Sequence, residues 1–156
     1  MRYPRLMMCC LALTLAGCEE SSPRRSVVQV DQDNLAEVGE LCRHYQFMKK
    51  KPPQNFADLN AVRTMAGNGY EALRSGTVVL LYGATLPDMD EEPGHAETSE
   101  ILAYQKDVPE SGGYVLLLNR TVKKLTADEF KAAPRPAGSA PGGPTPAGKD
   151  PAPKKK

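Results

Sequence analysis

The 156-residue chain has no tryptophan, only two histidines, and nearly equal numbers of acidic and basic side chains, 19 against 20. A formal net charge of +1 gives neither the basic surface typical of a nucleic-acid-binding protein nor a field that attracts acidic substrates. His44 and His95 lie far apart in the sequence, in different predicted elements, so no Ser/His/Asp or Cys/His arrangement can be assembled. These absences argue against nucleic-acid binding and against enzymatic acid–base chemistry.

Residues 1–17 have the pattern of a signal peptide. Arg2 and Arg5 give a short positive region, and residues 6–15 follow without a charge. Such an uncharged run is too short to cross a membrane, which takes roughly 20 residues. We therefore expect the segment to direct export and then to be removed.

Leu15-Ala16-Gly17-Cys18 resembles the lipobox of bacterial lipoproteins at all four positions. The resemblance implies cleavage before Cys18 and attachment of at least two acyl chains there, and two chains anchor a protein stably where one does not. The alternative is an ordinary secretory signal with a chance cysteine at the cut site, or a short uncleaved anchor. We expect a lipid-anchored protein of the bacterial cell envelope, with its domain outside the cytoplasm.

Four cysteines reduce to one in the predicted mature chain. Cys9 and Cys10 leave with the signal peptide and Cys18 carries lipid, so only Cys42 remains. A domain with one cysteine has no internal disulfide. Cys42 falls on the apolar side of a predicted helix, where we interpret it as a small buried hydrophobic side chain rather than a reactive thiol.

The mature chain divides into three segments. Residues 18–30 are polar and are predicted to form a tether. Residues 31–133 carry the periodic apolar pattern and suit one small domain. Residues 134–156 contain seven prolines and the run Lys154-Lys155-Lys156, without an aromatic or branched apolar side chain. Because nothing in that segment offsets the entropy of ordering, it is predicted to be a disordered tail.

The first element of the domain is a predicted helix. Its apolar residues recur at three- and four-residue steps: Leu35, Val38, Cys42, Tyr45 and Met48. Asn34 and Glu37 have the spacing of a capping box at its start, and Pro52-Pro53 stops it. A second short helix is predicted at 56–62, followed by a loop at 67–69 and a further turn at 70–74.

After Gly76 the pattern changes to strands, predicted at 77–82, 101–105, 114–118 and 121–125. Asn119-Arg120 is predicted as a tight hairpin link, although arginine is unfavourable in such a turn. Thr126 and Glu129 form a second capping box before a last short helix. Helices followed by strands predict an α+β fold, with the first helix packed on a small antiparallel sheet of three to four strands.

This order of elements resembles the globular part of pseudopilins: a leading helix, Pro52-Pro53 with residues 56–59 (FADL) downstream, then a strand meander. Residues 101–130 (ILAYQKDVPESGGYVLLLNRTVKKLTADEF) are similar to the C-terminal end of pilin-like proteins of planctomycete bacteria. The chain departs from that family in two respects. A lipobox replaces the long filament-building helix, and Pro109 stands where such proteins often carry a histidine. The resemblance implies a shared fold without filament assembly.

One concentration of metal-ligand side chains occurs, at Asp88, Asp90, Glu91, Glu92, His95 and Glu97. Oxygen-rich loops bind calcium when a turn folds them around one point, and major pseudopilins use such a loop. An EF-hand register fails because Pro93 takes the place of the required glycine. Asp88, Asp90 and Glu92 are therefore candidate calcium ligands, but we favour the interpretation of a solvated acidic loop.

Together these patterns predict a membrane-anchored envelope lipoprotein with a non-enzymatic structural or assembly role. Its expected contacts are the membrane, through lipid on Cys18, and an envelope protein partner. No cofactor is expected. The alternative is a module that binds calcium through the acidic loop 88–97, or cell-wall polymer through the basic tail.

Overall fold

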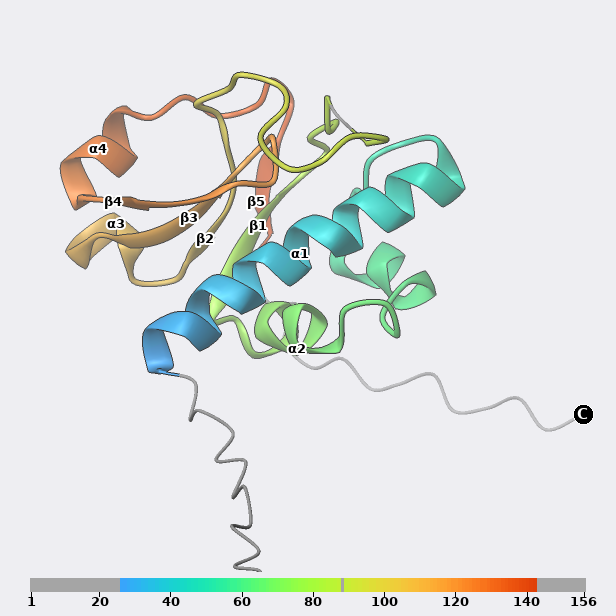
Figure 1. Ribbon diagram of the computed structural model, residues 1–156, viewed down its shortest axis with the longest axis horizontal. Coiled ribbons are helices and arrows are strands. Elements are labelled where there is room, and N and C mark those ends of the chain that lie inside the picture. Colours follow the sequence, from blue (N-terminus) through green and yellow to red (C-terminus); the bar gives the residue numbers. More distant parts are fainter. Residues whose placement is uncertain (1–25, 88, 143–156) are drawn as a thin grey trace, which may run out of the picture.

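The computed structural model describes residues 26–87 and 89–142. The elements in chain order are α1 (Val27–Lys49), a 3₁₀ helix η1 (Phe56–Ala61), α2 (Gly67–Ser75), β1 (Val78–Tyr82), β2 (Ile101–Gln105), α3 (Val108–Ser111), β3 (Gly113–Leu117), β4 (Val122–Leu125), α4 (Ala127–Ala132) and β5 (Ala140–Gly142). The strands form one antiparallel sheet in the order β4-β3-β2-β1-β5, with α1 lying across it (Figure 1). The predicted α+β fold is confirmed.

The sheet has one strand more than the upper limit predicted. β5 pairs with β1, with Leu80 opposite Gly142 and Tyr82 opposite Ala140. This strand comes from the segment predicted to be disordered, so that prediction needs correction for residues 134–142. An edge strand is held by backbone hydrogen bonds, which require no apolar side chain, and composition alone therefore missed it. Residues 143–156 of the predicted tail lie outside the described residues.

α1 begins eight residues earlier than the stripe of apolar residues indicates. Its N-cap is Ser26, whose hydroxyl accepts a hydrogen bond from Gln29 N at 3.2 Å. The capping box predicted at Asn34 and Glu37 is therefore wrong, and residues 27–30, expected in the tether, form the first turn. These early residues bury no apolar stripe, so periodicity could not reveal them.

The apolar side of α1 packs on the sheet as predicted. Leu35, Val38, Cys42 and Tyr45 are buried with the inward side chains of the strands, whereas Met48 is 54% exposed and does not belong to the stripe. Burial raises the pKa of the Cys42 thiol to about 12. Cys42 is thus buried in the core, which agrees with its interpretation as a small hydrophobic side chain.

The opposite face of the sheet has a smaller core of its own. Its members come from the strands, α3 and α4: Ile101, Val108, Val115, Leu125 and Phe130. The capping box predicted at the start of α4 is confirmed, because Thr126 and Glu129 exchange both hydrogen bonds. The sheet is therefore covered on both sides.

Two predicted connections are corrected. Residues 67–69 are the first turn of α2 rather than a loop. The link between β3 and β4 spans residues 118–121 rather than two residues, and Leu117 N donates to Thr121 O across it at 2.8 Å. Arg120 has a φ of 64°, a left-handed conformation that arginine seldom adopts. Its side chain turns inward, where it contacts both α1 and the loop between β1 and β2.

Candidate functional site

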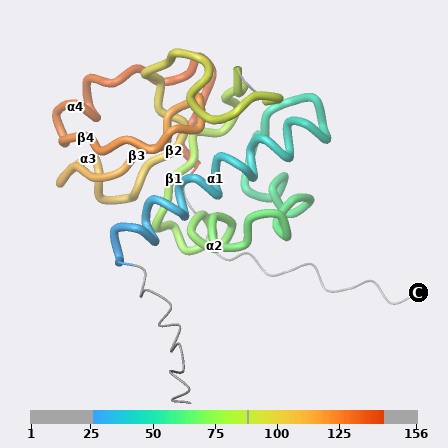
Figure 2. The backbone as a smooth tube through the Cα atoms, viewed as in Figure 1, coloured from blue at the N-terminus to red at the C-terminus, as the bar shows by residue number. Residues whose placement is uncertain are grey.

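The loop between β1 and β2, residues 83–100, carries the acidic cluster and runs beside the C-terminal half of α1 (Figure 2). Arg120 attaches it to the helix. The Arg120 side chain is 3% exposed; its Nη1 donates to Glu40 Oε1 at 2.9 Å, and its Nη2 donates to the backbone oxygen of Glu91. One buried arginine therefore joins the β3–β4 link, α1 and the acidic loop.

Glu40 forms an ion pair with this arginine. Partial burial acts to raise the pKa of Glu40, but the hydrogen bonds and charges of Arg43 and Arg120 outweigh it, so the pKa is lowered. Arg43 Nε donates to Glu40 Oε2 at 2.8 Å. This role could not be predicted from the sequence, because Glu40 lies next to the apolar stripe and has the pattern of an ordinary surface residue.

A second buried polar contact fixes the start of the acidic loop. The amide of Gln46 in α1 donates from Nε2 to Leu86 O at 3.2 Å and accepts from Leu86 N at 3.0 Å. Further along, Gly94 N donates to Asn119 O, and Asn119 Nδ2 donates to Ala96 O, both at 2.8 Å. The loop is thus fastened by its backbone, which leaves its carboxylates at the surface.

Two of the three candidate calcium ligands lie within the described residues. Asp90 and Glu92 are exposed on this loop, and Asp88 lies outside the described residues. His95 Nε2 lies 3.1 Å from Glu91 Oε2, and both side chains are largely exposed. Within residues 26–87 and 89–142, no group of three or more His, Cys, Asp or Glu side chains is arranged to hold a metal ion. Cys18, the predicted lipid attachment site, also lies outside the described residues.

An open groove with a volume of about 540 Å³ separates the first half of α1 from α2, and it is the candidate contact surface of the domain. Six of its eight lining residues are of polar type, and the lining comes from both helices and from the residue before β1: Val30, Asp33, Asn34, Asn68, Glu71, Ala72, Ser75 and Thr77. Neither histidine nor cysteine is among these residues. The lining thus presents side chains that can form hydrogen bonds with a bound partner.

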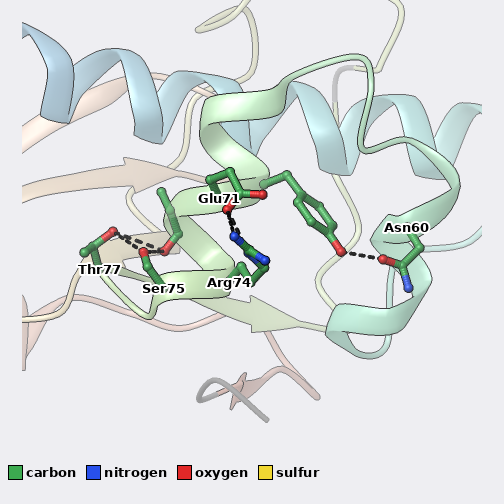
Figure 3. A network of polar contacts seen from close by, with 7 residues as sticks. Asn60, Glu71, Arg74, Ser75 and Thr77 are labelled. Atoms are coloured by element: carbon green, nitrogen blue, oxygen red, sulfur yellow. Dashed lines mark hydrogen bonds and ion pairs between the residues drawn. The ribbon is translucent and has the colours of Figure 1, made fainter. Parts of the chain in front are cut away.

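The polar groups of α2 along this groove are already engaged (Figure 3). Glu71 Oε2 lies 2.6 Å from Arg74 Nη2, and the hydroxyls of Ser75 and Thr77 each donate to Ala72 O at 3.1 Å. A hydroxyl that donates to a carbonyl has no base to activate it as a nucleophile. The network closes the end of α2 and fixes the wall of the groove.

α1 and α2 make a close contact at the start of α2. Glu37 in α1 accepts hydrogen bonds from Asn68 Nδ2 and from Gly69 N, both at 2.9 Å, and so caps the start of α2. A Cβ atom on Gly69 would lie 2.8 Å from the backbone of Glu37 and Val38. Only glycine allows this approach. From the sequence, Gly69 was predicted to lie in a turn. Its role in the contact between the helices could not be predicted, because such a contact leaves no pattern in the neighbouring residues.

Comparisons with models of protein families, with curated proteins and with solved structures find no match to this chain. Among the helices of the described residues, none is both long enough and apolar enough to cross a membrane. A functional proposal therefore depends on the lipobox and on the surface of the domain.

Proposed function

We propose that this protein is a lipid-anchored lipoprotein of the bacterial cell envelope, whose domain has a non-enzymatic structural or assembly role outside the cytoplasm. The observation that carries the proposal is Leu15-Ala16-Gly17-Cys18, placed directly after a short uncharged segment. The small residues fit a signal-peptidase cleft, and the cysteine sulfur is the atom that accepts the lipid. Each buried CH₂ of the acyl chains contributes about 0.8 kcal/mol to membrane binding.

The start of the domain supports a position close to the membrane. The covalent path from Cys18 to Ser26 spans at most about 29 Å. The first turn of α1 also has no acidic residue. Instead it exposes Val27, Val28 and Val30, of which Val27 is 78% accessible. Apolar side chains at this end suit the interfacial region of a bilayer.

A non-enzymatic role is supported by the structural roles of three titratable groups whose pKa values are shifted. Glu40 forms an ion pair that fixes a loop, Cys42 is enclosed in the core, and Glu129 caps α4. Perturbed pKa values often mark active sites, but each of these three has a structural explanation. The pseudopilin resemblance enters the proposal as a shared fold only, since a lipobox stands in place of the filament helix.

The anchor is tested by metabolic labelling. Cells that produce the wild-type chain or a Cys18→Ser variant are grown with an alkyne-bearing fatty acid. We expect label on the wild type only, and a larger apparent mass for the variant because its signal peptide stays uncut. A wild-type chain without label contradicts the proposal.

The assembly role is tested in intact cells by chemical cross-linking before membrane extraction. We expect a discrete adduct with an envelope protein. The adduct should weaken when the groove is changed by Asn34→Lys and Thr77→Lys, and should persist when Lys106→Glu is made on another surface. A chain that stays monomeric at every cross-linker concentration contradicts the role.

A further inference from the structure

The groove between α1 and α2 carries charge of one sign. Asp33 from α1 and Glu71 from α2 are the charged residues among its eight lining residues, and both are acidic. Carboxylates repel phosphates and other anions, so this lining favours a cationic ligand. The groove volume of about 540 Å³ suits an organic ligand of many atoms rather than a bare metal ion.

The C-terminal end of α2 adds hydrogen-bond acceptors to the same groove. Ala72 and Ser75 in this end of the helix, and Thr77 just beyond it, line the wall. The last carbonyl groups of an α-helix carry a partial negative charge. The hydroxyls of Ser75 and Thr77 each donate to Ala72 O at 3.1 Å, so their oxygens act as acceptors toward a ligand (Figure 3). This wall therefore favours a cation rich in donors.

The other lining residues match a polypeptide that carries basic side chains. Val30 is 42% exposed on the α1 wall, and Ala72 lines the α2 wall. Arginine and lysine pack their methylene stems on such apolar surface while their charged ends reach a carboxylate. Asn34 and Asn68 have amide groups that can both donate and accept, as the peptide groups of a bound chain require.

We propose that the groove binds an arginine-bearing segment of the envelope protein partner; this inference rests on the proposed assembly role. The planar guanidinium group donates in pairs to a carboxylate, which makes arginine a better match than lysine. Glu71 already pairs with Arg74, but both side chains are exposed. Exposed ion pairs contribute little to stability, so an arginine of the partner can exchange with Arg74.

The groove is formed before any partner binds. Glu37 accepts hydrogen bonds from Asn68 Nδ2 and Gly69 N, both at 2.9 Å, and these bonds hold α2 against α1. Gln29 Nε2 donates to Asp33 Oδ1 at 3.0 Å and orients that carboxylate. A surface whose side chains are already positioned loses less conformational entropy when it binds.

The test uses the mature chain from residue 18 with Cys18→Ser, so that no lipid obscures peptide binding. Three fluorescent peptides of equal length serve as probes, in which alanine alternates with arginine, glutamine or glutamate. Fluorescence anisotropy gives each Kd. The groove variant combines Asp33→Asn with Glu71→Gln, which removes both charges and keeps the side-chain sizes. The matched control combines Asp128→Asn with Glu110→Gln, at exposed positions of α4 and α3.

We expect the arginine peptide to bind at least about tenfold more tightly than the other two. The groove variant should raise its Kd at least about tenfold, and the control less than about twofold. Equal losses in the two variants would overturn the inference, because net charge rather than the groove would then govern binding. Equal affinity for the three peptides would also overturn it.

Arg74→Gln gives a second readout that keeps both carboxylates of the groove. It removes the arginine that pairs with Glu71, so the arginine peptide should bind more tightly than to the parent chain. Weaker binding would overturn the inference. Two other occupants would overturn it as well. Peptide binding that appears only after deletion of residues 143–156 would assign the groove to the chain's own lysines, and a dimer that the peptide dissociates would assign it to a second copy.

Cross-linking in intact cells separates this inference from the assembly role. A discrete adduct with an envelope protein that persists in the Asp33→Asn, Glu71→Gln variant contradicts the inference alone. Binding of the arginine peptide to the purified chain, together with no adduct in cells, contradicts the assembly role but supports the groove as a site for basic segments.

Discussion

The two faces of the sheet are held in different ways. On the α1 face, the polar contacts join residues far apart in the sequence: Arg120 with Glu40 across 80 positions, and Gln46 with Leu86 across 40. On the α4 face they are local. The Thr126–Glu129 capping box spans three positions, and Arg135 donates to Phe130 O five positions away while lying over its ring at 4.3 Å.

The two faces therefore differ in the sequence separation of the residues whose polar contacts stabilise them. The α4 face depends on short-range signals that a sequence displays directly. The α1 face depends on side chains that acquire a role only when the loop, the β3–β4 link and the helix meet. We therefore expect substitutions on the α1 face to lower the free energy of unfolding more than substitutions on the α4 face, and to affect more distant parts of the domain.

The largest effect is expected from Val38→Asp. Val38 is fully buried on the side of α1 that faces the sheet, so the variant places an unpaired charge in the core. The free energy of unfolding should fall by about 4 kcal/mol or more, measured by urea denaturation of residues 26–142. Ala36→Asp is the control, because it introduces the same side chain at an exposed position of the same helix and should cost less than about 1 kcal/mol. Equal losses would remove the assignment of the buried face.

Glu40→Ala should have the next largest effect. It removes the Glu40 carboxylate from the buried guanidinium of Arg120, and we expect a loss of about 2–3 kcal/mol in the free energy of unfolding. Glu71→Ala, which removes the exposed pair with Arg74, should cost less than about 1 kcal/mol. Similar values for the two variants would show that the Arg120 contact does not support the α1 face.

The same ion pair predicts a pH dependence. Because the folded-state pKa of Glu40 lies below its ordinary value of 4.5, its contribution to stability is present above pH 4.5 and is lost as the pH falls through the lowered pKa. Glu40→Gln should therefore be least stable relative to the wild type near neutral pH, and the gap should narrow in acid. A gap that widens in acid contradicts the direction of the pKa change.

Gly69→Ala tests the contact between α1 and α2. A Cβ atom there meets the α1 backbone at 2.8 Å, so α2 must shift, and we expect a loss of about 2 kcal/mol. Gly67→Ala in the same helix meets nothing within 4 Å and should be neutral or slightly stabilising. Thermal denaturation of both variants measures the difference. If Gly69→Ala were as stable as Gly67→Ala, the close approach of the helices would be wrong.

The smallest effect is expected on the α4 face. Thr126→Ala removes one half of the capping box and should cost about 1 kcal/mol, whereas Thr126→Ser keeps the hydroxyl and should cost less than half of that. Amide hydrogen exchange should speed up in α4 while α1 stays protected. Faster exchange throughout α1 would show that the two faces are coupled rather than separate.

The sequence predicted the parts of the fold that depend on neighbouring residues. The α1 stripe apart from Met48, the strands β1 to β4 and the Thr126 capping box follow from periodicity and spacing, and these are present. β5 was missed because its stability comes from pairing with β1 rather than from its own side chains. The early start of α1 was missed because Ser26 alone marks it.

The candidate site was far less predictable. The groove forms because α2 lies against α1. The closest contact between these two helices involves Gly69, which was predicted from the sequence to be part of a loop. From the sequence, Arg120 was unfavourable in a turn. The structure shows that its side chain points inward and pairs with Glu40, which accounts for an arginine at this position. Local sequence patterns cannot predict a side-chain contact between two residues that are 80 positions apart, such as Arg120 and Glu40.

We propose that the mature chain begins at Cys18 and carries lipid there. The most direct measurement is the intact mass of the protein extracted from membranes with detergent, followed by fragmentation of its first peptide. We predict a chain that lacks residues 1–17, with a diacylglyceryl group on the first residue, Cys18. A membrane-bound chain that retains residues 1–17, or a chain cut elsewhere with an unmodified Cys18, would contradict the account.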